Sequence, residues 1–170
     1  MLTESERMSS ASEARFRLQA PNSEPREIKV IALDAPSEAL VRQLAERSWN
    51  RATFLSASSF AAGLPAAQDT ARDGWLVDLD GRSRNLMDEV SSADLVVMVA
   101  NPGGDAQVAA IIGELCGELR VNTAAFIYGA TASSEEAISR TPAQLRPWSL
   151  MVVVAKSEDY IEDMLVALRA

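Results

Sequence analysis

The sequence predicts an α/β fold: a three-layer, doubly wound, mainly parallel six-stranded Rossmann-like sheet. Apolar runs of strand length alternate with segments of helical periodicity from Glu27 onward. Four of these runs are apolar on both faces, which requires helices on both sides of the sheet. Alternation of this kind is typical of parallel strands joined by helical crossovers. We therefore expect one domain over residues 27–170.

The elements are expected in a regular order along the chain. The predicted strands cover residues 28–34, 52–58, 74–81, 94–100, 123–130 and 149–155. The predicted helices cover 36–49, about 83–92, about 105–119, about 134–140 and about 158–169. Pro142, which follows Thr141, is expected to end the fourth of these helices because proline has no N–H to donate. With strand 28–34 central, the expected strand order is 3-2-1-4-5-6.

The first 26 residues form a leader that is rich in Ser, Glu, Arg and Pro and shows no helical periodicity. We expect a mobile segment. One stretch differs, because Phe16 and Leu18 alternate with Arg15, Arg17 and Gln19. A period of two can add an edge strand to a sheet or dock on another chain. A plain disordered tail is the preferred interpretation, and the edge strand or docking motif is the alternative.

The composition excludes several classes of function. The chain has 24 Asp and Glu against 16 Lys and Arg, a net charge of -8, and its scattered cations argue against nucleic acid. It has no histidine, which removes Ser-His and Cys-His pairs and nearly all zinc sites. The single Cys116 gives no sign of an oxidising compartment, and no apolar run is long enough to span a bilayer. We expect a cytoplasmic protein without a membrane segment.

Ligands of doubly wound sheets bind at the carboxyl ends of the strands, where the strand order reverses. We expect ligand-binding side chains in the segments that follow the predicted strands, and we assign no catalytic residue and no metal ligand. The candidate ligand-binding residues are Asp34, Ser37, Asp78, Asp80, Asn101, Gly103, Gly104, Asp105, Thr131 and Lys156.

The loop Asn101-Pro102-Gly103-Gly104-Asp105 stands where many α/β proteins hold a phosphate. It has two glycines but neither Lys nor Ser/Thr, and Asp105 would bring a carboxylate to the position of the anion. We therefore predict a self-satisfied turn in which Asp105 caps the following helix. Asp34 or Ser37 can cap the helix after the first strand in the same way. No cofactor is expected.

Two further groups of residues admit different interpretations. Asp34, Asp78, Asp80 and Lys156 could converge on Mg²⁺ and a phosphate, but Asp78 and Asp80 also suit an ordinary turn around Gly81. Cys116 shares its helical face with apolar residues, so we predict a buried small side chain and not a nucleophile.

Three segments carry a resemblance to a known family: IKVIALDAPSEALVRQLAE, SSADLVVMVANPGGDAQVAAIIGEL and TAAFIYGA. In this order they resemble their counterparts in the nucleotide-binding domain of the bacterial tubulin-like cell-division GTPases. The similarity covers about residues 28–168 and lies in hydrophobic pattern and order, because Asp34-Ala35-Pro36-Ser37 and Asn101–Asp105 replace the glycine-rich loops of that family. The resemblance implies a compact, degenerate member without nucleotide. A second resemblance, to phosphoacceptor receiver domains, involves Asp34, Thr131 and Lys156.

These observations favour a non-catalytic protein-interaction or regulatory module built on a degenerate nucleotide-binding type of fold. The expected partner is another protein, bound through Phe16 and Leu18. The alternative is a small-ligand or nucleotide-binding protein that uses the loops at the carboxyl ends of the strands. An enzyme that uses Asp, Lys and Tyr chemistry is a third, less favoured, class.

Overall fold

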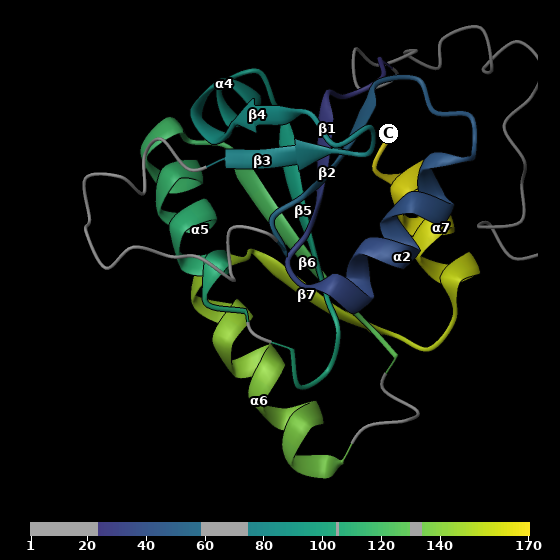
Figure 1. The fold of residues 1–170 in the computed structure, drawn as a ribbon, viewed down its shortest axis with the longest axis vertical. Coiled ribbons are helices and arrows are strands. Elements are labelled where there is room, and N and C mark those ends of the chain that lie inside the picture. The colour runs from purple at the N-terminus through teal and green to yellow at the C-terminus, as the bar shows by residue number, and fades with distance from the viewer. Residues whose placement is uncertain (1–23, 59–74, 105, 130–133) are drawn as a thin grey trace, which may run out of the picture.

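A seven-stranded sheet forms the centre of the molecule, in the order β4-β3-β2-β1-β5-β6-β7 (Figure 1). The computed structural model describes residues 24–58, 75–104, 106–129 and 134–170. Five strands are parallel to one another: β1 (Ile28–Ala32), β2 (Ala52–Ser56), β5 (Leu95–Ala100), β6 (Asn122–Tyr128) and β7 (Met151–Ala155). The α/β class, the mainly parallel sheet and the central place of the first strand are confirmed.

The sheet departs from the prediction at the edge beyond β2. β3 (Trp75–Asp78) occupies the predicted place but runs antiparallel to β2, and it forms a hairpin with an additional strand, β4 (Ser83–Asn85). Asp78 closes the turn by accepting hydrogen bonds from the N–H groups of Asp80 and Arg82, at 3.0 and 2.9 Å. Gly81 adopts the φ of 83° that the turn needs. A turn this short can join only antiparallel neighbours, so β4 runs antiparallel to β3. With β4 the sheet has seven strands instead of six.

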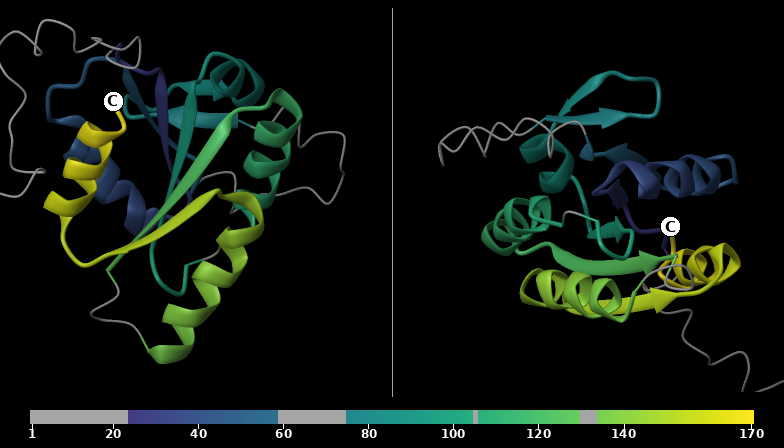
Figure 2. Two further views of the ribbon diagram at one scale, coloured as in Figure 1. Left: turned by 180° about the vertical axis from the view of Figure 1, so that it is seen from behind. Right: turned by 60° about the horizontal axis from the view of Figure 1, so that its bottom comes forward.

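Helices cover both faces of the sheet (Figure 2). α2 (Ala35–Ala45) and α7 (Glu158–Ala167) pack on one face, over a cluster that contains Val30, Val97 and Phe126. α5 (Val108–Leu119) and the shorter α4 (Leu86–Ser91) pack on the other face, over Ile31, Met98 and Ile127. Every residue of β1 and β5 is buried. The three-layer arrangement follows from these apolar runs, because a strand buried on both faces needs cover on both.

α6 (Glu135–Leu145) is longer than predicted and is followed by a short 3-10 helix, η4 (Arg146–Trp148). Pro142 lies inside α6 and does not end it. Thr141 and Leu145, on either side of this proline, are fully buried. Packing of this segment therefore outweighs the loss of one helical hydrogen bond. None of the helices in the described residues is long and apolar enough to cross a membrane.

Candidate functional site at the carboxyl ends of the strands

The five parallel strands reverse their order between β1 and β5. The chain leaves β1 toward α2 on one face of the sheet and leaves β5 toward α5 on the other face. The loops after these two strands diverge at such a switch point, where doubly wound sheets hold their ligands. Asp34 follows β1 and Asn101 follows β5, so two predicted site residues lie at this point.

The carboxylate of Asp34 joins the two loops. Its Oδ1 accepts hydrogen bonds from the backbone N–H of Ser37 at 2.8 Å and from the Ser37 hydroxyl at 2.6 Å. Its Oδ2 accepts the backbone N–H of Asn101 at 2.8 Å. Asp34 is the N-cap of α2, with Pro36 in the first turn, so the expected cap by this residue is confirmed. The carboxylate thus receives the backbone donors that would otherwise point at an anion.

The loop after β5 packs directly on this carboxylate. A Cβ added to Gly104 would collide with Asp34 Oδ2 and would lie 3.0 Å from the Asn101 carbonyl oxygen. Gly104 donates to that carbonyl at 2.9 Å, while Gly103 donates to the hydroxyl of the buried Thr141 at 2.9 Å. Gly104 therefore lets the backbone approach Asp34 closely, and both glycines are bound within the protein instead of forming an open phosphate cradle.

Gly129, which follows β6, shapes the other side of the Asn101 side chain. Its φ is 106°, and a Cβ at this position would lie 2.8 Å from Asn101 Oδ1. The amide nitrogen of Asn101 donates to the Pro102 carbonyl at 3.5 Å, which is long for a hydrogen bond. Asn101 is only partly buried. Its amide is therefore held weakly, beside the backbone of Gly129.

A second carboxylate lies one helical turn along α2. Glu38 Oε1 receives the Arg42 guanidinium at 2.7 and 3.2 Å, and Glu38 Oε2 receives the hydroxyls of Ser56 and Ser58 at 3.0 and 2.9 Å. Arg42 also donates to the Leu79 carbonyl at 2.8 Å. The hydrogen bonds from Arg42, then Ser58 and Ser56, lower the pKa of Glu38 despite its partial burial. This group joins α2, the end of β2 and the β3–β4 hairpin, and the lowered pKa makes Glu38 a weaker base than a free carboxylate.

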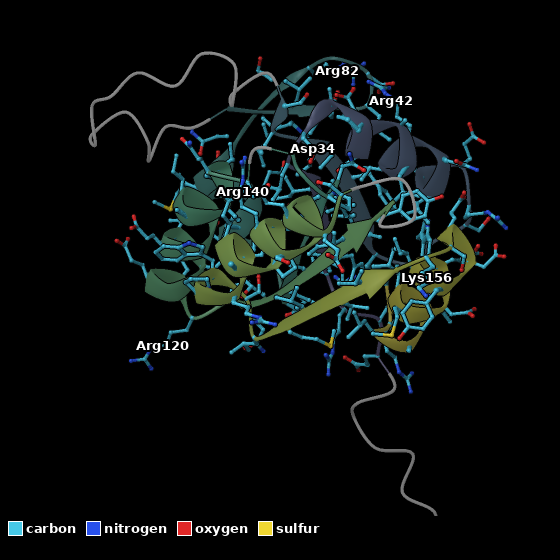
Figure 3. The ribbon with its side chains drawn as sticks, turned by 90° about the horizontal axis from the view of Figure 1, so that it is seen from below. Asp34, Arg42, Arg82, Arg120, Arg140 and Lys156 are labelled. Atoms are coloured by element: carbon cyan, nitrogen blue, oxygen red, sulfur yellow. The ribbon has the colours of Figure 1, made fainter. Side chains whose placement is uncertain are left out.

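Asp78, Asp80 and Lys156 do not join the switch point. Asp78 pairs with Leu55 near the end of β2, two strands from Asp34, and because β3 is antiparallel the chain then runs back toward the amino ends of the parallel strands, so Asp78 and Asp80 belong to the hairpin turn. Two strands separate β7 from β1, so Lys156 is about 14 Å from Asp34 along the sheet, and Figure 3 shows the two residues well apart. The alternative in which these residues converge on Mg²⁺ is therefore wrong, and Asp78 and Asp80 lie in the ordinary turn that the sequence also allowed. Among the described side chains, no group of three Asp, Glu or Cys residues is placed to hold a metal ion.

The other predicted site residues divide into two groups. Ser37, Asn101 and Gly104 lie together around Asp34, at the ends of the first and fourth predicted strands, whereas Gly103 is bound to Thr141. Asp105 and Thr131 lie outside the described residues, so the proposed cap by Asp105 stays a prediction. α5 itself begins at Val108 and not near residue 105, and its N-cap residue Gln107 makes no side-chain capping bond.

Sequence reasoning missed several residues of this region. Glu38 and Arg42 have the i, i+4 spacing of a helical ion pair, so their contact could have been found. Thr141, on α6, and Gly129, after β6, contact the loop after β5, and no local sequence pattern predicts these contacts.

Cys116 is confirmed as a core residue: it is 1% exposed, and burial raises the pKa of its thiol to about 12.

A separate groove lies at the opposite ends of the strands. Its volume is about 580 Å³, and it is lined by Pro25, Ser48, Trp49, Asn50, Val166, Ala167, Arg169 and Ala170. The Trp49 N–H donates to the Leu44 carbonyl at 2.7 Å, and the ring packs against Phe54 with centroids 5.9 Å apart. This tryptophan is therefore anchored in the protein by both its polar atom and its ring.

No family model and no curated protein matches the chain. Among solved structures, the chain is similar to the apo form of a flavoprotein from Lactobacillus acidophilus NCFM, determined by NMR. The two are 14% identical with a TM-score of 0.45, and the match covers 80% of this chain and 97% of that chain.

The expected function is corrected here. The similar structure is named as a flavoprotein, and the expectation of a non-catalytic interaction or regulatory module is withdrawn. The ligand-binding alternative is the one retained. At 14% identity and a TM-score of 0.45 the likeness does not say which ligand, so the chain's own residues must decide. The resemblance to tubulin-like GTPases stays a prediction, as does a partner protein bound through Phe16 and Leu18, which lie outside the described residues.

Proposed function

We propose that the protein binds a small organic ligand over the carboxyl ends of β1, β5 and β6, and that this ligand is neutral or cationic and carries no phosphate. The observation that carries the proposal is the Asp34 carboxylate, which spans the switch point from Ser37 to Asn101. Switch points are the usual ligand sites of doubly wound sheets, and here the chain supplies its own anion.

The charge of this rim selects against phosphate. A phosphate bound to the first turn of α2 would need the Ser37 and Asn101 N–H groups that Asp34 already occupies. It would also lie beside a carboxylate, in a protein of net charge -8. The neighbouring cation, Arg42, is bound to Glu38 and to the Leu79 carbonyl. A nucleoside or another uncharged ring avoids this repulsion.

The surface beside Asp34 suits a flat molecule that forms hydrogen bonds. Gly104 and Gly129 let the Asp34 carboxylate and the Asn101 side chain lie directly against backbone, so glycines and not larger side chains flank Asn101. The weakly held amide of Asn101 can turn to donate a hydrogen bond to a ligand and accept one from it.

We place the protein in the cytoplasm.

Thermal unfolding with matched ligand pairs tests the proposal. Adenosine is compared with AMP, and riboflavin with FMN, because each pair differs only by a phosphate. A ligand that binds the folded state alone raises the melting temperature. We expect a phosphate-free member to raise it and its phosphate ester to have little effect.

Two variants locate the binding. Asn101→Ala should abolish the shift, whereas Asn122→Ala, at the exposed start of β6 and the other end of the sheet, should preserve it. No shift with any member of the two pairs, or larger shifts with the phosphate esters, would contradict the proposal.

A further inference from the structure

The two edges of the sheet differ in length and charge. β4 has three residues, Ser83–Asn85. The exposed Arg84 lies within this strand, and the exposed Arg82 directly precedes it. Short, charged edges resist pairing with further strands. β7 has five residues, Met151–Ala155, and none of them is charged. Within the described part of the chain, no strand pairs with the outer side of β7.

The open edge of β7 presents different chemistry on its two faces. On the α5 face, Leu150 is 79% exposed and Val154 is 44% exposed, with the partly buried Val152 between them. On the other face, Met151 and Val153 pack into the cluster that α7 covers. α7 begins there with Glu158 and Asp159 and carries Asp163 one turn later. Figure 2 (right) shows β7 at the margin of the sheet, between α6 and α7.

The leader contains a segment that matches both faces. In Arg15-Phe16-Arg17-Leu18-Gln19, alternate side chains point to opposite faces of an extended strand. Phe16 and Leu18 would lie on the face of Leu150 and Val154. Arg15 and Arg17 would then lie on the face of the acidic first turn of α7, where opposite charges attract.

We propose that residues 15–19 pair with the free edge of β7 as an eighth, antiparallel strand. Arg26 is fixed near the amino end of β1, where its N–H donates to the Arg169 carbonyl at 2.9 Å. A strand beyond β7 lies four spacings from β1, about 19 Å. Residues 20–26 span up to about 23 Å when extended. A fully extended linker can therefore reach the amino end of β7, and the strand must then run antiparallel to β7.

Amide hydrogen exchange of the full chain tests this pairing residue by residue. β7 alternates N–H groups that point to β6 with N–H groups that point outward, and a new strand protects the outward ones. The test variant carries Phe16→Asp and Leu18→Asp. The control carries Ser10→Asp and Ser12→Asp, which have the same charge and spacing outside the alternating segment.

We expect the outward amides of β7 to exchange at least tenfold faster in the test variant than in the wild type or the control. The amides of β1 and β5 should be unchanged, which shows that the domain remains folded. Val154→Asp, on the receiving edge, should have the same effect as the leader variant. Equal exchange of β7 in all four proteins would overturn the proposal. Protection that rises with protein concentration would also overturn it, because a second copy would then supply the strand.

Discussion

Asp34 and Glu38 are two carboxylates at one end of α2, and they differ in their hydrogen-bond partners. Asp34 is held by the backbone N–H groups of Ser37 and Asn101 and by the Ser37 hydroxyl. Glu38 is held by the Arg42 guanidinium and by the hydroxyls of Ser56 and Ser58. Asp34 therefore joins two loops of backbone, and Glu38 joins side chains around a cation.

The difference shows what each carboxylate contributes. Backbone N–H groups at a helix start attract any anion, so Asp34 takes the place of a ligand's phosphate and its removal leaves that place open. Glu38 neutralises Arg42 and ties α2 to β2 and the hairpin, so its removal frees a cation at the surface. In the proposed function, the first carboxylate determines which ligand the switch point accepts, while the second links α2 to β2 and the hairpin.

The largest effect is expected from Asp34→Ala. This variant loses a helix cap and a link across the switch point, and it leaves backbone donors without partners in a partly buried place. We expect it to lower the free energy of unfolding by about 2 to 3 kcal/mol. Glu38→Ala should lower the free energy of unfolding by about 1 kcal/mol, because water can form hydrogen bonds to the hydroxyls and to the half-exposed arginine that it leaves without a partner. Urea denaturation of both variants measures the difference, and equal costs would remove the distinction between the two carboxylates.

Gly104→Ala should come next, at about 2 kcal/mol. The added methyl group would collide with Asp34 Oδ2 and approach the Asn101 carbonyl. In the Asp34→Ala background most of this cost should disappear, because the obstructing oxygen is gone. Gly117→Ala is the matched control: no atom lies within 4 Å of the added Cβ in α5, so we expect stabilisation of up to about 1 kcal/mol. A cost that persists in the double variant would show that Asp34 is not what confines the loop.

The smallest effect concerns the dependence of stability on pH. Because the folded state lowers the pKa of Glu38 below 4.5, its contribution is present above that pH and is lost as the pH falls through the folded pKa. The difference in unfolding free energy between the wild type and Glu38→Gln should therefore narrow from about pH 7 to about pH 3. Glu114→Gln, on the exposed side of α5, corrects for the loss of one negative charge. A difference that stays constant with pH would contradict the role of Arg42 and the two serines.

Much of the fold could be predicted because the decisive signals are local. The apolar runs of β1 and β5 are long, and their alternation with helices led to the correct order of the predicted strands. β4 was not predicted because Ser83-Arg84-Asn85 carries no apolar pattern. α6 passes Pro142 because burial of Thr141 and Leu145 depends on residues far away in the sequence.

The candidate site was predictable only in part, for the same reason. Asp34 and Ser37 could be recognised as a cap from their spacing alone. The bond from Asn101 to Asp34 joins residues 67 positions apart, and only the sheet brings them together. Asp78 was wrongly predicted at the ligand site because an apolar pattern does not determine the direction of a strand. The four residues of β3 fit a parallel or an antiparallel strand equally well.

Phosphate titration followed by NMR tests most directly whether Asp34 takes the place of an anion. The backbone amides of Ser37 and Asn101 are observed in the wild type and in Asp34→Ala while inorganic phosphate is added at constant ionic strength. We expect both amides to shift and saturate in Asp34→Ala, because the vacated donors bind the anion, and to remain unchanged in the wild type. Saturable shifts of these amides in the wild type, or none in Asp34→Ala, would contradict the account.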